Sequence, residues 1–155
     1  MNEGSEVVRR WDATALRAGA SVALVFAVPC SLGARWAAEQ RDDSALAFWL
    51  SVGAVIGFVV GAGCAAWVQT VGLPLTHGLV TALATYSAAQ AVFVTIRLLR
   101  GSEVNWFAAL FNLSVVAGAG LLGGSLGGRL RAKGFRPGSM PTTDRHDGDD
   151  GPVRR

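Results

Sequence analysis

The chain has 155 residues, a formal net charge of +3, 51 % apolar residues and only 16 % charged residues. A soluble domain usually carries about 25 % charged residues, so this composition excludes an ordinary soluble protein, and the small positive balance does not support a nucleic-acid partner. The charges are also segregated, because residues 44–96 contain no Asp, Glu, Lys or Arg. We therefore expect an integral membrane protein with a single domain.

The charge-free segment is too long for one membrane helix. Its 53 residues would form a helix of about 80 Å, whereas the hydrocarbon core of a bilayer is about 30 Å thick. The segment must fold back once, and Gly72-Leu-Pro74 is the best place, since Gly tolerates a tight reversal and Pro lacks a backbone donor. Apolar windows between charged flanks predict four spans, at residues 14–34, 45–71, 73–96 and 106–128.

The tryptophan positions agree with these spans. All five tryptophans lie close to a predicted span end, where an amphipathic ring is stable in the headgroup region. They are Trp11, Trp36, Trp49, Trp67 and Trp106.

The distribution of basic residues predicts the orientation of the chain. Seven lie near the spans on the side that holds both termini, namely Arg9, Arg10, Arg17, Arg129, Arg131, Lys133 and Arg136. Four lie on the opposite side, namely Arg35, Arg41, Arg97 and Arg100. Because the side richer in Lys and Arg faces the cytoplasm, we expect a multi-pass protein of the plasma (inner) membrane with both termini in the cytoplasm.

The segments outside the transmembrane domain (residues 14–128) predict two cytoplasmic ends. Residues 1–13 form a short N-terminal segment, and residues 129–155 combine a basic juxtamembrane segment with a tail rich in Pro, Gly, Asp and Arg, a composition typical of disorder. The aspartates of the tail loosely resemble a calcium loop, but the closing Glu and the spacing are missing, so we expect no metal site.

Glycines of the last span match a nucleotide-binding pattern without its context. The stretch from Gly118 to Gly123 fits G-x-G-x-x-G, but no strand precedes it and no acidic residue follows at the required distance. We therefore expect no nucleotide and no other cofactor. A four-residue period fits better, because residues four apart share one helix face. It occurs in two rows, Gly53, Gly57 and Gly61 in the second span and Gly120, Gly124 and Gly128 in the fourth.

The two glycine rows predict close helix packing. Faces without side chains let helix backbones approach each other in lipid, where the hydrophobic drive between helices is weak. We favour packing within one chain, with dimerisation through the same faces as the alternative. Each half of the chain also runs from a helix with an early glycine into a helix with a glycine row. The expected fold class is an all-α membrane protein with four transmembrane helices, arranged as two tandem helical hairpins with glycine-zipper packing.

The third span carries the main polar residues of the membrane region. His77, Thr81 and Thr85 follow four-residue steps on one face, and Gln90 lies further along the span. Polar groups inside a membrane are costly, so they indicate a polar path or a proton-linked site. Alternatively, the hydroxyls bond to carbonyls of their own helix and Gln90 bonds to a neighbouring helix. No charged residue lies deep in any span, which weakens the case for transport.

Short motifs in the second half of the chain resemble a known family. They are the stretch Gly72-Leu-Pro-Leu-Thr-His77-Gly78, then Tyr86, and the glycine-rich stretch at residues 117–127. With these motifs the chain resembles the YrzE-like small membrane proteins of bacteria, over about residues 53–128. The resemblance implies a bacterial plasma-membrane protein with four spans. The family has no established activity, so the resemblance implies no substrate.

The sequence therefore predicts a non-enzymatic integral membrane protein that acts through helix packing or as an accessory or assembly subunit. No catalytic triad, carboxylate pair or metal cluster is found, so we expect no catalytic, cofactor-binding or metal-binding residue. The expected partners are the lipid bilayer and either a second copy of the chain or a membrane complex. The alternative is a small oligomeric transporter or channel that uses the polar face of the third span.

Overall fold

A computed structural model of the protein describes residues 11–135, and these residues form four α-helices and no strand. The helices are α1 (Ala13–Gln40), α2 (Ser44–Val68), α3 (Pro74–Leu99) and α4 (Trp106–Ala132). Each of them is long and apolar enough to cross a membrane. The prediction of an all-α protein with four membrane-spanning helices is confirmed. The expectations for residues 1–10 and for the tail at residues 136–155 lie outside the described residues.

The helix ends follow from local capping chemistry. The side chains of Asp12, Asp43 and Asn105 accept hydrogen bonds from backbone N–H groups in the first turns of α1, α2 and α4. Helix α3 has no side-chain cap and begins instead at Pro74, whose missing N–H is harmless in a first turn. Gly72 has φ +84°, so the reversal between α2 and α3 uses a backbone conformation that favours glycine.

Three helices extend beyond the expected spans. Helix α1 continues through the polar residues 35–40, α3 through residues 97–99 and α4 through residues 129–132. Hydropathy marks only the part of a helix that suits lipid, whereas backbone hydrogen bonding continues into the headgroup region. Helix α2 ends at Val68, three residues before the expected end of its span, because Gln69 leaves the helical conformation.

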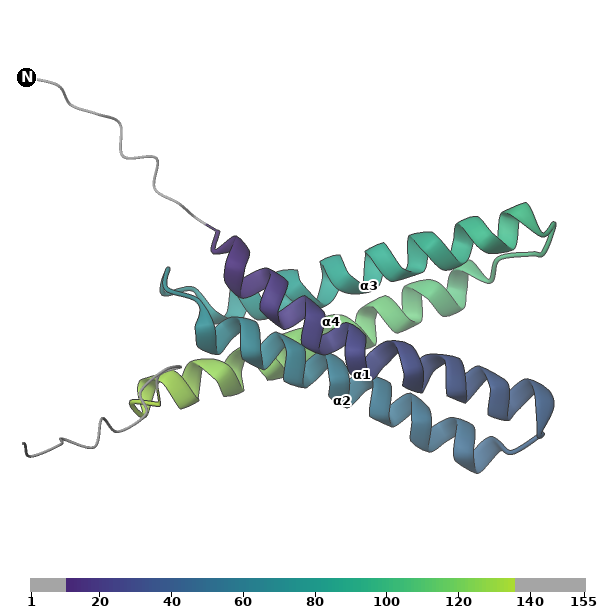
Figure 1. The fold of residues 1–155 in the computed structure, drawn as a ribbon, viewed down its shortest axis with the longest axis horizontal. Helices are drawn as coiled ribbons and strands as arrows, with labels where there is room; N and C mark the ends of the chain where they lie inside the picture. Colours follow the sequence, from purple (N-terminus) through teal and green to yellow (C-terminus); the bar gives the residue numbers. More distant parts are fainter. Residues whose placement is uncertain (1–10, 136–155) are drawn as a thin grey trace, which may run out of the picture.

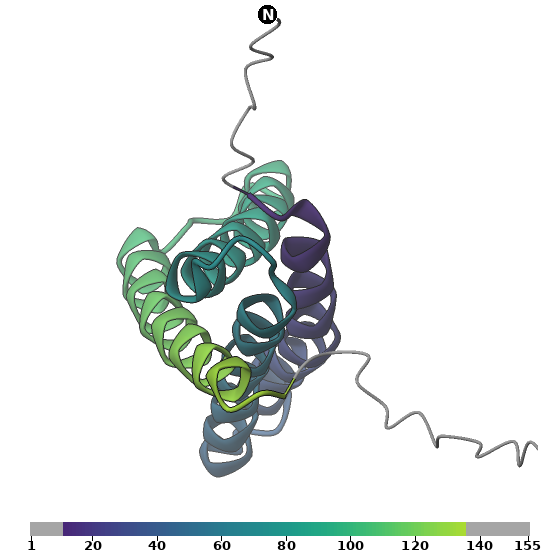
Figure 2. The same ribbon diagram turned by 90° about the vertical axis from the view of Figure 1, so that its left-hand side faces the viewer.

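The four helices form two antiparallel hairpins, α1–α2 and α3–α4 (Figure 1). Helix α2 contacts the other three helices and α3 contacts α1 and α4, whereas α1 and α4 have no contact within the described residues. The view from one end shows the helices around a common axis, with α1 and α4 on opposite sides (Figure 2). The hairpins lie close together at one end and diverge toward the other (Figure 1).

We name the two halves of the molecule by their ends. The terminal-side half holds the start of α1, the α2–α3 turn and the end of α4, and its helices are tightly packed. The turn-side half holds the α1–α2 turn and the α3–α4 turn, and its hairpins lie apart (Figure 1). The two halves therefore differ in how closely the hairpins approach each other.

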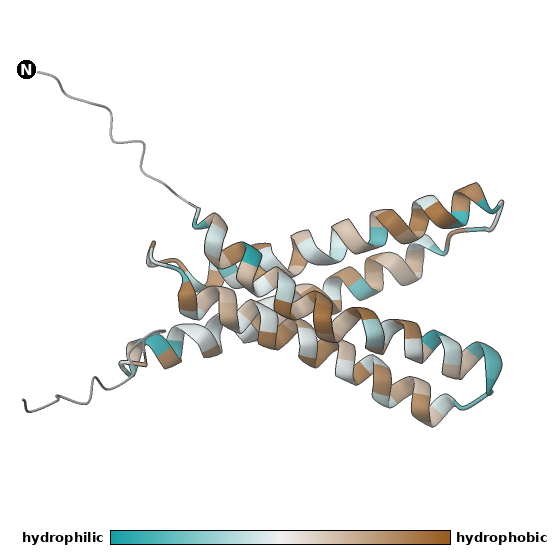
Figure 3. Ribbon diagram, in the orientation of Figure 1, coloured by the Kyte–Doolittle hydropathy of each residue, from teal (hydrophilic) through white to brown (hydrophobic). Residues whose placement is uncertain are grey.

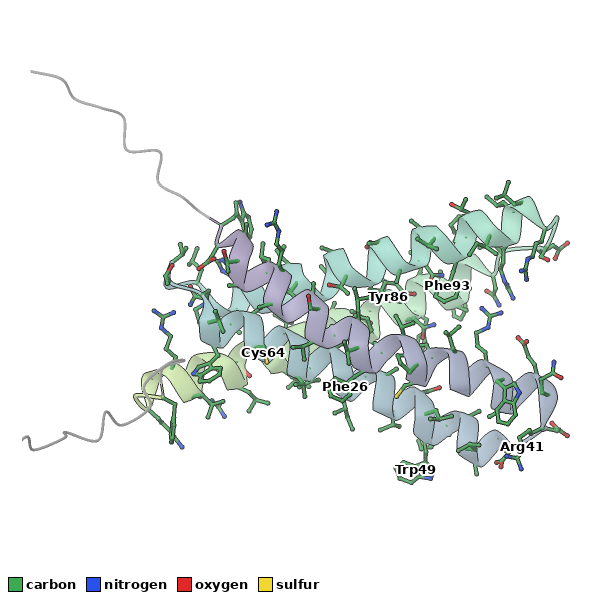
Figure 4. All side chains as sticks on the ribbon, in the orientation of Figure 1. Phe26, Arg41, Trp49, Cys64, Tyr86 and Phe93 are labelled. Carbon is green, nitrogen blue, oxygen red and sulfur yellow. The ribbon has the colours of Figure 1, made fainter. Side chains whose placement is uncertain are left out.

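The core consists mainly of small residues. Its buried hydrophobic cluster contains Ala23, Ala27, Ala54, Phe58, Ala62, Ala82, Val116 and Ala119. The large apolar side chains lie on the outside, and Phe26 and Trp49 project away from the bundle (Figure 4). Apolar residues run along all four helices, and hydrophilic residues gather toward the ends (Figure 3). An apolar exterior around a small-residue interior suits a protein whose solvent is lipid.

Candidate functional site

The glycine row of α2 lies against α1. A Cβ atom built on Gly61 would lie 2.6 Å from both the Cβ of Ala23 and the carbonyl oxygen of Gly19. A Cβ on Gly57 would lie 2.8 Å from the Cβ of Phe26, and one on Gly53 would lie 3.2 Å from the Sγ of Cys30. The row is therefore covered by the other helix of its own hairpin.

The glycine row of α4 lies against α3. A Cβ on Gly120 would lie 2.9 Å from the Cβ of Ala82, and a Cβ on Gly124 would lie 3.1 Å from the Cα of Leu75. A Cβ on Gly128 would lie 3.1 Å from the ring of Pro74. The row thus occupies the inside of the second hairpin.

Two further glycines of α4 join the hairpins to each other. Gly123 faces the backbone of α2, where a Cβ would meet the carbonyl of Val59 and would lie 2.9 Å from the backbone nitrogen of Gly63. One turn later, Gly127 faces the carbonyl of Gly63 and would place a Cβ 2.9 Å from that of Ala66. These contacts lie in the terminal-side half and hold α2 against α4 there.

His77 is fully buried at the start of α3. Its Nε2 accepts a hydrogen bond from the backbone N–H of Asp12 at 3.1 Å, and its Nδ1 lies 2.9 Å from the carbonyl oxygen of Leu73. A backbone N–H can only donate and a carbonyl can only accept, so this geometry specifies the neutral ring with its proton on Nδ1. The ring also lies 5.9 Å from that of Trp11. His77 thus links α3 to the start of α1.

Asp12 forms the centre of a hydrogen-bond network at the terminal end. Its Oδ1 accepts from the backbone N–H groups of Thr14 and Ala15, and its Oδ2 accepts from the N–H and the hydroxyl of Thr70. The bond from Ala15 is the largest cause that lowers the pKa of Asp12 below its ordinary value of 3.8; burial opposes it, and the bonds from Thr70 and Thr14 also lower the pKa. This network ties the α2–α3 turn to α1.

Thr81 and Thr85 continue from His77 along the buried face of α3. They are 2 % and 5 % exposed, and their hydroxyls have no hydrogen-bond partner among the described residues. The methyl group of Thr81 lies against Gly19 of α1. The structure thus brings His77, Thr81 and Thr85 together inside the terminal-side half.

Gln90 is separated from these three residues. It lines a cleft of about 470 Å³ between the hairpins in the turn-side half. Tyr86 and Phe93 lie on the side of α3 that faces this cleft (Figure 4). All four helices contribute to its walls, among them Leu24, Val28 and Ala34 of α1, Ser51 and Val55 of α2, Ala89 and Val94 of α3, and Ala108, Asn112 and Val115 of α4.

The cleft is layered along the helix axes. Arg35 and Arg97, from opposite hairpins, line the cleft near the turn-side ends of α1 and α3, and we call this end of the cleft its mouth. Gln90 lies seven residues before Arg97, about 10 Å deeper at 1.5 Å per residue. Tyr86 lies about 16 Å deeper than Arg97 by the same measure. Its ring meets that of Phe58 edge to face at 6.3 Å, and its hydroxyl donates to the carbonyl oxygen of Ala109 at 3.0 Å. The cleft therefore has a cationic mouth, a polar middle and an aromatic floor.

Nearby groups neutralise the two arginines at the mouth of the cleft only in part. Arg35 forms a 3.4 Å ion pair with Glu39, and both side chains are exposed. Nη1 of Arg97 donates to the backbone carbonyl of Glu103 at 3.1 Å, and the other guanidinium donors of Arg97 have no partner among residues 11–135. Two arginines and one glutamate line the cleft, which leaves its mouth net positive.

Sequence reasoning did not find this cleft. Gln90 drew attention as an intramembrane polar residue, but nothing joined it to Arg35 and Arg97. One signal was present: residues 106–117 of the fourth span contain no glycine, whereas residues 118–128 contain six. This distribution predicts that α4 approaches its neighbours closely only over residues 118–128.

The described residues contain no group of three or more His, Cys, Asp or Glu side chains that could hold a metal ion. Comparisons with known proteins add no relative: no family model, no curated protein and no solved structure matches this chain. The candidate site therefore has to be interpreted from its own geometry.

Proposed function

We propose that this integral membrane protein is a non-enzymatic accessory subunit that acts by holding a membrane-embedded ligand in the cleft between its hairpins. The observation that carries the proposal is the cleft itself, which places a cationic mouth above free amide groups within a membrane-spanning bundle. Its volume of about 470 Å³ falls in the usual range of small-ligand sites, about 300–1,000 Å³.

The glycine packing favours the cleft, and not a face of glycines, as the site where the protein acts. Gly57 and Gly124 are both covered by helices of the same chain, so their faces serve the internal scaffold. A second copy that used these rows would first have to displace α1 or α3. In this proposal, glycine-zipper packing closes one half of the molecule and leaves the other half open.

The amides in the cleft also support a binding role. The side chains of Gln90 and Asn112 line the cleft and have no hydrogen-bond partner in the described part of the chain. Polar groups at membrane depth are costly unless water, protein or a ligand satisfies them. A hydrated cleft or a ligand with polar groups would meet this need.

The proposed location in the membrane follows from the sequence. The excess of basic residues on the terminal side supports a bacterial plasma membrane with both termini in the cytoplasm, and the resemblance to YrzE-like proteins agrees with that location. In this orientation the mouth of the cleft opens on the outer side of the membrane.

A small transporter is the second candidate function. The unpartnered hydroxyls of Thr81 and Thr85 favour it, because they extend from the floor of the cleft toward the terminal end. His77 stands at the end of this row. A transport path would need the packed terminal-side half to open, and the accessory function needs no such opening.

Cysteine accessibility in intact cells tests the proposal. In a background with Cys30→Ala and Cys64→Ala, a membrane-impermeant maleimide added outside should label Gln90→Cys. Ala84→Cys, on the exposed outer face of α3, is the matched control and should stay unlabelled because lipid covers it.

Three outcomes separate the alternatives. Labelling of Gln90→Cys without labelling of Thr85→Cys supports a binding cleft closed at its floor. Labelling of both favours the transporter. Protection of Gln90→Cys both in intact cells and in detergent micelles from which lipid has been removed would overturn the cleft proposal. Labelling only from the inside of the membrane, in inverted vesicles, would overturn the orientation instead.

A further inference from the structure

We infer that the ligand of the cleft is an anionic phospholipid from the leaflet at the turn side, with its headgroup between Arg35 and Arg97. This inference rests on the proposed function, because it needs the cleft to be a binding site. It goes further by naming the class of ligand and the two residues that select it.

Charge favours a phosphate group at the mouth. Arg35 extends from α1 and Arg97 from α3, so both hairpins present a guanidinium to the same opening. A guanidinium binds phosphate oxygens through paired N–H donors, and it keeps its charge in a membrane environment. Only Glu39 among the residues that line the cleft opposes them, and it is already paired with Arg35.

The wall below the mouth suits the remainder of a lipid. Gln90 and Asn112 offer hydrogen-bond groups about 10 Å below the mouth, where a headgroup joins its chains through polar linkages. Deeper residues are apolar or aromatic, including Phe58, Val116 and the ring of Tyr86. A lipid with its headgroup at the mouth and its chains toward the floor would match this order of cationic, polar and apolar layers.

Access from the bilayer follows from the helix contacts. The close contacts between α1 and α3, at Asp12–His77 and Gly19–Thr81, lie in the terminal-side half. Those between α2 and α4, at Gly63 with Gly123 and Gly127, lie there as well. Toward the turn side the hairpins diverge (Figure 1), and the cleft lies between them. In the inferred binding mode the lipid enters sideways from the bilayer at this end.

The width of the occupant favours a lipid over a partner helix. A helix is about 10 Å wide, so it would need more separation of the hairpins than a single acyl chain does.

Native mass spectrometry of the full chain tests the inference. The protein is purified with an equal mixture of phosphatidylglycerol and phosphatidylcholine that carry identical acyl chains. We expect about tenfold more retained phosphatidylglycerol, and a preference within about twofold of unity for the Arg35→Gln/Arg97→Gln variant. The matched control is Arg41→Gln/Arg100→Gln, which removes two charges on the same side but outside the cleft, where Arg41 stacks on Trp36 at 5.4 Å.

Two further arms identify the source of the phosphate group and the place of binding. Soluble glycerol phosphate should not displace the bound lipid, and displacement would overturn the lipid assignment in favour of a free phosphate ligand. Ala89→Trp should reduce retention of both lipids several-fold, because it fills the cleft without a change of charge. The variant Arg35→Lys/Arg97→Lys should keep most of the preference.

The inference and the proposed function fail in different ways. Equal retention of the two lipids by the wild-type chain, or an equal loss in the Arg41/Arg100 control, would overturn the anionic-lipid site. Labelling of Gln90→Cys would then still support a binding cleft. If Gln90→Cys is shielded on both sides of the membrane and Ala89→Trp changes nothing, the cleft itself is wrong.

Discussion

The terminal-side and turn-side halves of this molecule are made from the same four helices but packed in different ways. In the terminal-side half, backbones meet directly at glycines such as Gly61, Gly78 and Gly123. In the turn-side half, the glycines within helices, Gly33 and Gly53, lie only between α1 and α2, and bulky residues occupy the first part of α4. The position of small residues along each helix therefore decides where this membrane bundle closes and where it stays open.

The largest effect is expected from a side chain introduced where the backbones meet. Gly123→Val would place its Cβ against the Val59 carbonyl and 2.8 Å from the Cβ of Ala62. Backbone cannot move aside as a flexible side chain can, so we expect a loss of about 3 kcal/mol or more in the free energy of unfolding. Unfolding by increasing sodium dodecyl sulfate in mixed micelles would measure it.

Gly118→Val is the control for that change. It lies on the same helix, but a Cβ there would meet nothing within 4 Å, so it should cost less than about 1 kcal/mol. Equal destabilisation by both variants would show that glycine content as such, and not close contact between helices, matters in α4.

Removal of the buried imidazole should have the next largest effect. His77→Leu leaves the backbone N–H of Asp12 without its present partner, whereas the carbonyl of Leu73 keeps its bond from the backbone N–H of residue 77. We expect a loss of about 2 kcal/mol in unfolding free energy, since an unpaired buried polar group costs about 1–3 kcal/mol. The same detergent titration measures it. Thr95→Val, which removes an exposed hydroxyl bonded within its own helix, should change stability by less than about 0.5 kcal/mol.

Asp12 gives the terminal-side half a dependence on pH. Because its pKa in the folded protein lies below 3.8, its contribution to stability is complete above about that value and disappears as the pH falls through the lowered pKa. Asp12→Ala should cost about 1 kcal/mol at neutral pH, as the loss of a helix N-cap usually does.

Unfolding titrations between pH 6 and roughly pH 2 would test this dependence. The wild-type chain should lose stability relative to Asp12→Asn only at the acidic end. A constant difference between the two chains over the whole range would show that the charge of Asp12 contributes nothing, and that its role is hydrogen bonding alone.

The smallest effect is expected in the turn-side half. Ala108→Leu adds three carbon atoms to a residue that lines the cleft, where free space is available. We expect a change of at most about 0.5 kcal/mol, in contrast to Gly123→Val on the same helix. A large loss would mean that the hairpins are closed against each other in the bilayer.

The sequence was sufficient for the fold because its main signals are local. The charge-free run at residues 44–96 and the reversal at Gly72 predict two helices that the structure contains as α2 and α3. The spacing of Gly53 and Gly61 likewise marks a face that can approach a neighbour. Each of these signals depends on one helix or one turn.

The candidate site could not be predicted from the sequence because it joins residues from separate helices. Arg35 and Arg97 are 62 positions apart, and only the angle between the hairpins brings them to one opening. That angle depends on which of the neighbouring glycines of α4 face α2 and which face α3. A four-residue period does not distinguish Gly123 from Gly124, yet they contact different helices.

The order in which the helices meet also bears on biosynthesis. Helices α1 and α2 contact each other along the Gly53–Gly61 row and can do so as soon as the ribosome has made them. The face of α2 around Gly63 finds its partner only when the end of α4 has been made, on the order of several seconds later at 5–20 residues per second. During that interval the nascent chain exposes a backbone-rich surface to the insertion machinery. The last helix to enter the membrane is thus the one that seals the bundle.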